Sequence, residues 1–140
     1  AVRARTAPTL MTPHAGEAAA LLGVAREEVE AARLTAVREL AARYRATVLL
    51  KGSTTLVADP DGGPVRVNAT GTPWLATAGS GDVLSGLAGS LLAAGLAPRD
   101  AGSVAAYLHG LAGRLAAHGA PIAAHDVADS IPSAWRDVEE

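Results

Sequence analysis

The chain has 140 residues, of which 49% are apolar and 19% are charged, and it contains no cysteine. This length predicts a single domain, and the apolar content argues against intrinsic disorder. Without cysteine, neither a disulfide scaffold nor a cysteine-ligated zinc site is possible. A net charge of −2 offers no basic surface for nucleic acid. No apolar run approaches the roughly 20 residues that a membrane-spanning helix needs, and no signal peptide opens the sequence, so we expect a cytoplasmic protein.

The composition is biased in two further ways. There are 33 alanines and no phenylalanine, so we expect a core of small side chains between closely packed elements. Eleven of the twelve basic residues are arginine, and Lys51 is the only lysine. A single lysine in an arginine-rich chain suggests a position where a planar guanidinium would not serve.

The first half of the sequence predicts alternating strands and helices. Short apolar or β-branched runs that end at turn residues indicate buried strands, and apolar residues at helical spacing indicate helices. No element is expected in residues 1–6. We then expect, in order, a strand at Pro8–Met11, a short helix at Gly16–Leu22, a long helix over Arg26–Tyr44, a strand at Thr47–Leu50 and a hairpin formed by Thr54–Ala58 and Val65–Asn68.

The second half is predicted to be mainly helical. Asn68–Gly81 has no periodicity and is expected to be a loop, with helices following at Asp82–Ala94, Asp100–Ala117 and His125–Val138, the last interrupted at Pro132. No repeat or linker divides the chain, so residues 1–140 form one unit. The order of the elements implies an α/β architecture with at least one βαβ crossover.

That crossover makes the first two strands parallel, which brings their carboxyl ends to the same edge of the sheet. In open α/β folds this edge binds ligands. His14 follows the first strand and Lys51 follows the second. The sequence therefore predicts that these two side chains lie at one ligand-binding edge.

A glycine-rich turn at residues 77–86 (TAGSGDVLSG) leads directly into an apolar helix. Glycine lets backbone N–H groups point inward as an anion nest, and the first turn of the helix adds unpaired N–H groups. In that first turn, Asp82 is placed to accept a proton from a hydroxyl that attacks a phosphoryl group. The alternative is ordinary helix capping by Ser80 and Asp82. The long adjoining loop favours a functional site.

The turn after the Thr47–Leu50 strand combines one ammonium group, one glycine and a run of hydroxyls, in Lys51, Gly52, Ser53, Thr54 and Thr55. It is not a P-loop, because the first glycine is missing and no helix follows. The set suits a nucleotide phosphate or ribose. A tight turn with an exposed lysine is the alternative, and the uniqueness of Lys51 favours function.

The histidines carry weaker signals. His14 and Glu17 could be an ordinary loop histidine and a helix-start carboxylate. His109 lies among leucines and is expected to be a satisfied core histidine. The histidines are too scattered for a zinc site, so we assign no metal ligand in this chain.

Together these segments resemble the ADP/ATP-dependent NAD(P)H-hydrate dehydratases of the ribokinase-like superfamily. The Gly-Ser-Gly-Asp element alone indicates the superfamily, whereas the TPHAGE element (12–17) together with the KGSTT element (51–55) is more specific. The ordered series is TPHAGE at 12–17, KGSTT at 51–55, NATG at 68–71, GSGDVLSG at 79–86 and HG at 109–110. The resemblance implies a three-layer α/β/α fold with a largely parallel central sheet. Because the family domain is roughly twice this length, the chain corresponds to its C-terminal half.

The resemblance also implies a repair enzyme, in which a nucleotide phosphorylates the C6 hydroxyl of hydrated NADH or NADPH and loss of phosphate restores the dinucleotide. By this pattern His14 and Asp82 contact the hydrated dinucleotide, with Asp82 as the base. Residues Lys51 to Thr55 and Gly81 contact ADP or ATP. Magnesium and a homo-oligomer, often a tetramer, are expected. The alternatives are a hydroxymethylpyrimidine or thiazole kinase of the same superfamily, and an inactive nucleotide-binding fragment.

Overall fold

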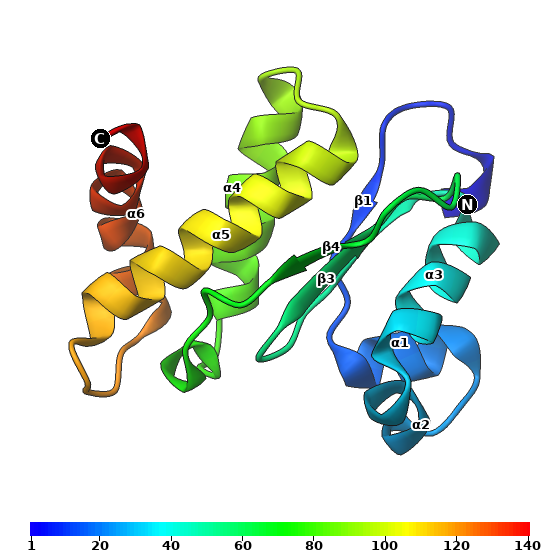
Figure 1. Ribbon diagram of the computed structural model, residues 1–140, viewed down its shortest axis with the longest axis horizontal. Coiled ribbons are helices and arrows are strands. Elements are labelled where there is room, and N and C mark those ends of the chain that lie inside the picture. The colour runs from blue at the N-terminus through cyan, green and yellow to red at the C-terminus, as the bar shows by residue number, and fades with distance from the viewer.

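A four-stranded sheet with the strand order β1-β2-β3-β4 lies between two groups of helices (Figure 1). The computed structural model describes all 140 residues. The strands are β1 (Leu10–Met11), β2 (Thr47–Leu50), β3 (Thr55–Ala58) and β4 (Arg66–Asn68). The helices are α1 (Ala15–Leu22), α2 (Arg26–Ala31), α3 (Arg33–Tyr44), α4 (Ser80–Ala93), α5 (Pro98–Ala117) and α6 (Ala124–Glu139), with short 3-10 helices at Val2–Ala4 and Pro73–Leu75.

The strand pairing combines one crossover with two antiparallel connections. Strands β1 and β2 are parallel, as the crossover predicts, and Leu10 lies opposite Thr47. Strands β2 and β3 are antiparallel, and so are β3 and β4. The expectation of a largely parallel sheet is therefore corrected to a mixed sheet within this chain. The connections that follow β2 and β3 are too short for the dozen or so residues that a parallel crossover needs.

The three-layer α/β/α arrangement is confirmed. In Figure 1, α1, α2 and α3 lie on one side of the sheet, and α4, α5 and α6 lie on the other. Helix α5 contacts β2 and β3, whereas α6 packs on α5 and α4 and does not reach the sheet. None of the helices is both long and apolar enough to cross a membrane.

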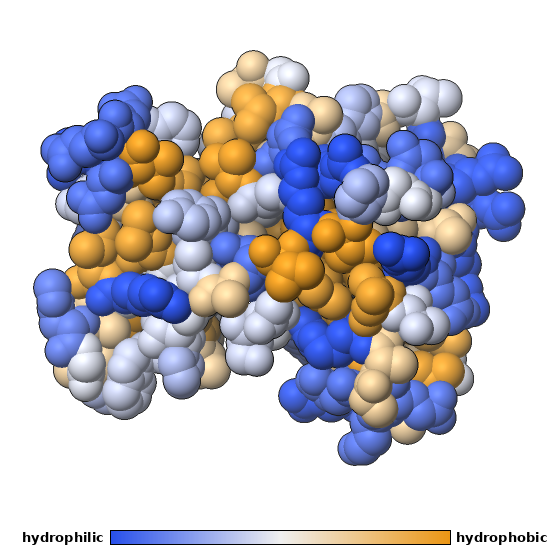
Figure 2. Space-filling model, viewed as in Figure 1, coloured by the Kyte–Doolittle hydropathy of each residue, from blue (hydrophilic) through white to orange (hydrophobic).

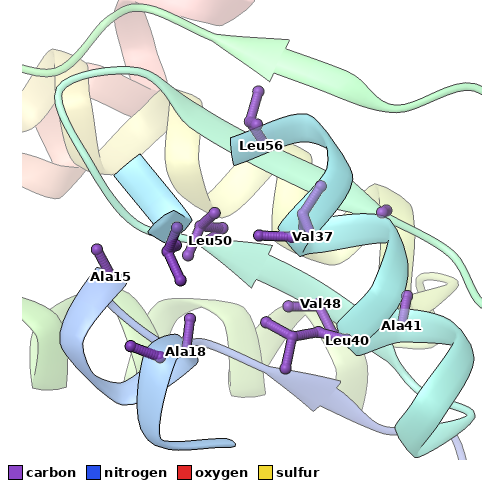
Figure 3. Close-up of a cluster of buried hydrophobic side chains, with 12 residues drawn as sticks. Ala15, Ala18, Val37, Leu40, Ala41, Val48, Leu50 and Leu56 are labelled. Atoms are coloured by element: carbon purple, nitrogen blue, oxygen red, sulfur yellow. The ribbon is translucent and has the colours of Figure 1, made fainter. Parts of the chain in front are cut away.

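Strand β2 is buried on both faces, and its alternating side chains divide between two cores. Val48 and Leu50 pack against α1 and α3, where Figure 3 shows Val37 and Leu40 beside them. Leu49 points to the opposite core, formed mainly by α4 and α5. Many of the buried positions are alanines, as the composition predicts. Figure 2 shows apolar surface in the middle of the view, where the strands lie in Figure 1.

Helix ends differ from the sequence prediction by at most two residues, but the continuity of two helices differs from it. The long helix expected over residues 26–44 is broken at Ala32, whose backbone (φ −143°, ψ 57°) is not helical. Conversely, Pro132 does not interrupt α6. Val127 and Ala134, on either side of this proline, are both fully buried in the core shared with α5, so tertiary packing outweighs the lost backbone hydrogen bond.

Candidate active site

A cleft of about 540 Å³ opens at the carboxyl edge of β1 and β2. The backbone N–H of Lys51 donates to the Pro13 carbonyl at 2.9 Å, so the loops that follow the two strands are joined. The predicted meeting of His14 and Lys51 at one edge is confirmed. Of the predicted site residues, the cleft is lined by His14, Lys51, Gly52, Ser53, Thr55 and Gly81.

The glycine-rich turn lines this cleft with Ser80 and Gly81, next to Lys51. Gly79 has φ +85° and is the N-cap of α4, a left-handed conformation that favours glycine. A Cβ on Gly81 would lie 2.9 Å from Nζ of Lys51. Gly81 thus leaves room for the ammonium group directly at the N-terminus of α4. The positive charge and the helix dipole act on the same space, which is the electrostatic requirement for binding an anion.

His109, on α5, stabilises this turn through hydrogen bonds to Ser80. Its Nε2 lies 3.0 Å from the Ser80 carbonyl oxygen and 3.3 Å from the Ser80 hydroxyl. Burial lowers the pKa of His109; the hydrogen bond to Ser80 raises it, and the charge of Lys51 lowers it further. The neutral ring must carry its proton on Nε2, because a carbonyl oxygen only accepts hydrogen bonds. The expected core histidine is confirmed, and its partner is the first residue of α4.

A second wall of the cleft is formed by residues 68–71, which are fastened to α5. The Thr70 hydroxyl donates to the Tyr107 carbonyl at 3.1 Å, and Nη2 of Arg114 donates to the Ala69 carbonyl at 3.1 Å. A Cβ on Gly110 would lie 2.7 Å from the Thr70 carbonyl carbon and 2.8 Å from the Gly71 nitrogen. Gly110 is therefore needed for the loop to approach the helix.

Arg33 is a supporting residue that the sequence analysis missed. It stands among charged residues of the expected Arg26–Tyr44 helix, yet its side chain is only 19% exposed. Nη2 donates to the carbonyls of Leu50, Lys51 and Thr54 at 3.4, 3.3 and 2.9 Å. The break at Ala32, which makes Arg33 the first residue of α3, has no glycine or proline to announce it.

Asp82 and Thr54 are the two predicted residues that do not line the cleft. Asp82 follows Gly81 in the first turn of α4 and is exposed, and its carboxylate has no hydrogen-bond or ion-pair partner. Ser85, one turn further along, lies 3.2 Å from the Thr12 hydroxyl, so this face of α4 is turned toward the loop that carries His14. Thr54 contributes its carbonyl to Arg33 rather than its hydroxyl to the cleft.

His14 and Glu17 form a capping box at the start of α1. The Glu17 N–H donates to Nδ1 of His14 at 3.1 Å, and the His14 N–H donates to Oε2 of Glu17 at 2.8 Å. The helix-start role of Glu17 is thereby confirmed. The imidazole ring itself is 59% exposed and lines the cleft.

The family model for NAD(P)H-hydrate dehydratase (Carb_kinase) matches residues 1–133. The chain belongs to this family. The ADP-dependent (S)-NAD(P)H-hydrate dehydratase of Neisseria meningitidis serogroup B is 49% identical over 127 residues, which cover 91% of this chain and 43% of the relative. The bifunctional NAD(P)H-hydrate repair enzyme Nnr of Mycobacterium leprae is 53% identical over 113 residues, 81% of this chain and 23% of the relative.

The fold of this dehydratase-family chain matches that of solved relatives. The ADP/ATP-dependent NAD(P)H-hydrate dehydratase from Bacillus subtilis, co-crystallised with ATP/Mg²⁺ and soaked with CoA, superposes with a TM-score of 0.86 at 34% identity. The match covers 93% of this chain and 49% of that structure. The expected ribokinase-like fold is confirmed. The chain spans half or less of the length of each of these three relatives.

Proposed function

We propose that this chain supplies the nucleotide-binding half of a site for the nucleotide-dependent dehydration of hydrated NADH or NADPH. The observation that carries the proposal is the meeting, in one cleft, of the Lys51 ammonium group, the N-terminal turn of α4 and the His14 imidazole. The names of the relatives, an ADP-dependent dehydratase at 49% identity among them, support the same substrate class.

The nucleotide is assigned to the side of the cleft between the turn that carries Lys51 and the glycine-rich turn that precedes α4. Lys51 and the free N–H groups at the start of α4 suit the oxygens of a di- or triphosphate. Gly52, Ser53 and Thr55 line the neighbouring wall, where hydroxyls and backbone groups suit ribose or phosphate. Thr54, which the structure leaves outside the cleft, contributes to the shape of the turn.

The chemistry is assigned to Asp82. Its carboxylate, one residue beyond the phosphate-binding turn and free of other partners, accepts the proton of the C6 hydroxyl as that oxygen attacks the terminal phosphoryl group. AMP leaves when ADP is the donor, and ADP leaves when ATP is. Phosphate is then expelled from this ester: the C6–O bond breaks as the ring nitrogen donates its electron pair, phosphate leaves with the C6 oxygen, and a proton is lost from C5.

Magnesium is assigned to the nucleotide rather than to a protein site. No three histidine or acidic side chains of the chain lie close enough to hold a metal ion. Mg²⁺ keeps several waters and is commonly bound through substrate phosphates plus one or two carboxylates. When bound, it neutralises charge on the phosphates, while Lys51 and the α4 turn orient them. We further propose a cytoplasmic homo-oligomer, a tetramer by family resemblance.

The test uses the complete domain, meaning these 140 residues joined to the segment that the relatives have in addition. With hydrated NADH, magnesium and ADP or ATP, absorbance at 340 nm should return, with free phosphate released in step. His14→Ala should raise the KM for the hydrate more than the KM for the nucleotide. A stable phosphorylated pyrimidine or thiazole alcohol without regenerated NADH would establish the kinase instead. Nucleotide binding with neither regenerated NADH nor a phosphorylated alcohol would leave the inactive nucleotide-binding fragment.

A further inference from the structure

The turn between β2 and β3 holds several of the residues proposed to bind the nucleotide. Its backbone carbonyls depend on a side chain for their hydrogen bonds. Three carbonyls, those of Leu50, Lys51 and Thr54, converge on one nitrogen of Arg33. Arg33 is 17 to 21 residues away from them in sequence. Backbone carbonyls that are removed from water need a hydrogen-bond donor, and a guanidinium group supplies such donors in a fixed planar arrangement.

Gly52 is fitted to this guanidinium. A Cβ at Gly52 would lie 2.5 Å from Nη2 of Arg33 and 2.9 Å from its Cζ, so any larger residue would displace the arginine. The absence of a side chain at Gly52 therefore serves the support of the turn as well as the approach of a ligand. Glu30, whose carboxylate lies 3.6 Å from Nη1 of Arg33, holds the other side of the guanidinium.

Arg33 does not itself line the cleft, whereas Lys51, Gly52 and Ser53 do. Its observed hydrogen bonds go to the carbonyls of the turn, so we expect its effect on binding to pass through the turn. The ammonium group of Lys51 sits against Gly81 in a gap that admits no Cβ. A small shift of the turn would therefore move that ammonium group away from the N-terminus of α4.

We propose that Arg33 is a positioning residue for nucleotide binding: by holding the three carbonyls of the turn, it fixes the Lys51 ammonium group against the N-terminal turn of α4. The proposal rests on the proposed function for the identity of the ligand, a nucleoside diphosphate or triphosphate. Lysine cannot replace Arg33, because a single ammonium group does not reproduce the planar donor geometry.

The experiment measures the Kd of ADP by calorimetry in the complete domain. Arg33→Gln and Arg33→Lys should each weaken binding by about 10- to 100-fold, the loss expected when a charged group such as Lys51 no longer meets a phosphate oxygen. The matched control is Arg43→Gln. Arg43 lies on the same helix and donates to the carbonyls of Leu21 and Leu22, both at 3.3 Å, and it does not line the cleft. Its Kd should stay within twofold of the wild type.

A double-mutant cycle separates positioning from general destabilisation. If Arg33 acts through Lys51, then Arg33→Gln should change the Kd by less than twofold in a Lys51→Ala background. Gly52→Ala should reproduce the loss seen for Arg33→Gln and add nothing to it. Should Arg33→Gln fail to fold, the Gly52→Ala and Arg33→Lys variants carry the test, with folding checked by thermal unfolding.

The outcomes that would overturn the proposal are distinct from those that would overturn the function. Full ADP affinity in Arg33→Lys would reduce the role of Arg33 to its charge, and independent, multiplying losses in the Lys51→Ala background would reduce it to stability. Either result contradicts positioning even when NADH is regenerated. A wild-type domain that binds ADP but regenerates no NADH contradicts the dehydratase and leaves the Arg33 comparison intact.

Discussion

Two turns face the same cleft and are held by different chemistry. The turn that carries Lys51 is fastened by the guanidinium of Arg33, which is charged at any physiological pH. The turn that precedes α4 is fastened by the ring of His109, which is buried and has a lowered pKa. The first support therefore keeps its charge at any such pH, whereas the second is a neutral ring that is protonated only in acid, because burial lowers the pKa of His109 below its usual 6.5.

The two supports also differ in the charge that they bring to the cleft. A guanidinium beneath the first turn adds positive charge behind a proposed phosphate site. A neutral imidazole behind the second turn adds none, and protonation there would place a cation close to Lys51, whose charge already lowers the pKa of His109. The neutral ring is thus suited to a position where a hydrogen-bond donor is needed next to an existing ammonium group.

The largest effect is expected at Asp82, which is hydrogen-bonded to neither Arg33 nor His109. Asp82→Asn should lower turnover by about 10²- to 10⁴-fold, because the group proposed to accept the hydroxyl proton is lost. Nucleotide affinity should remain within a few-fold, since neither turn is altered. Steady-state kinetics and ADP titration of the complete domain check both statements. The matched control is Asp129→Asn, an exposed carboxylate on α6. Equal activity in Asp82→Asn and wild type would remove the assignment.

The next effect tests the charge on the first turn. Lys51→Ala should weaken ADP or ATP binding by roughly tenfold to a hundredfold, because a hydrogen bond to a charged group contributes about 1.5–3 kcal/mol. Lys51→Arg should not restore affinity, since the ammonium group fills a narrow gap beside Gly81. Thermal unfolding without ligand should change little. Unchanged affinity measured by calorimetry would make Lys51 an ordinary surface residue.

The second turn is tested by His109→Phe, which keeps a ring but removes the donor to the Ser80 carbonyl. We expect a loss of about 1–3 kcal/mol in the free energy of unfolding, the usual cost when a buried polar group loses its partner. Urea unfolding measures it. His125→Phe, at a side chain that is 77% exposed, is the control and should change stability little. If both variants were equally stable, the support by His109 would be disproved.

The smallest effect is a pH dependence confined to the second turn. Folding lowers the pKa of His109 below its usual 6.5, so below that value the unfolded chain binds more protons than the folded chain. The His109 contribution to stability is therefore present above pH 6.5 and is lost as the pH falls below it toward the folded pKa. Unfolding curves at several pH values should show this slope, and it should be smaller in His109→Phe. An unchanged slope in that variant would point to other groups.

The elements that the sequence predicted well are those whose burial is a local pattern. Thr47–Leu50 was expected as a buried strand with its observed bounds, because four consecutive residues there are apolar or β-branched and all four are buried. The start of α4 was found within two residues, because a glycine-rich turn and an apolar helix adjoin. The edge shared by His14 and Lys51 followed from the parallel crossover alone.

What the sequence did not predict depends on contacts between distant segments. Arg33 resembles any arginine on a polar helix face until the β2–β3 turn is placed within reach of its guanidinium. The break at Ala32 and the uninterrupted helix at Pro132 reverse the usual local signals, because packing against other elements decides both. The fastening of residues 68–71 to α5 left one trace in the sequence, the glycine at position 110.

The capping box at the start of α1 determines which nitrogen of His14 is free. Nδ1 accepts from the Glu17 N–H, so the neutral ring carries its proton on Nε2. Nε2 lies 3.6 Å from the Glu17 carboxylate, too far for a hydrogen bond. The start of a helix thereby selects the tautomer that offers a donor, which suits an oxygen of the proposed dinucleotide substrate. Aspartate would keep the cap and remove that donor, because an ionised carboxylate only accepts hydrogen bonds, so His14→Asp separates the folding role of position 14 from its proposed binding role.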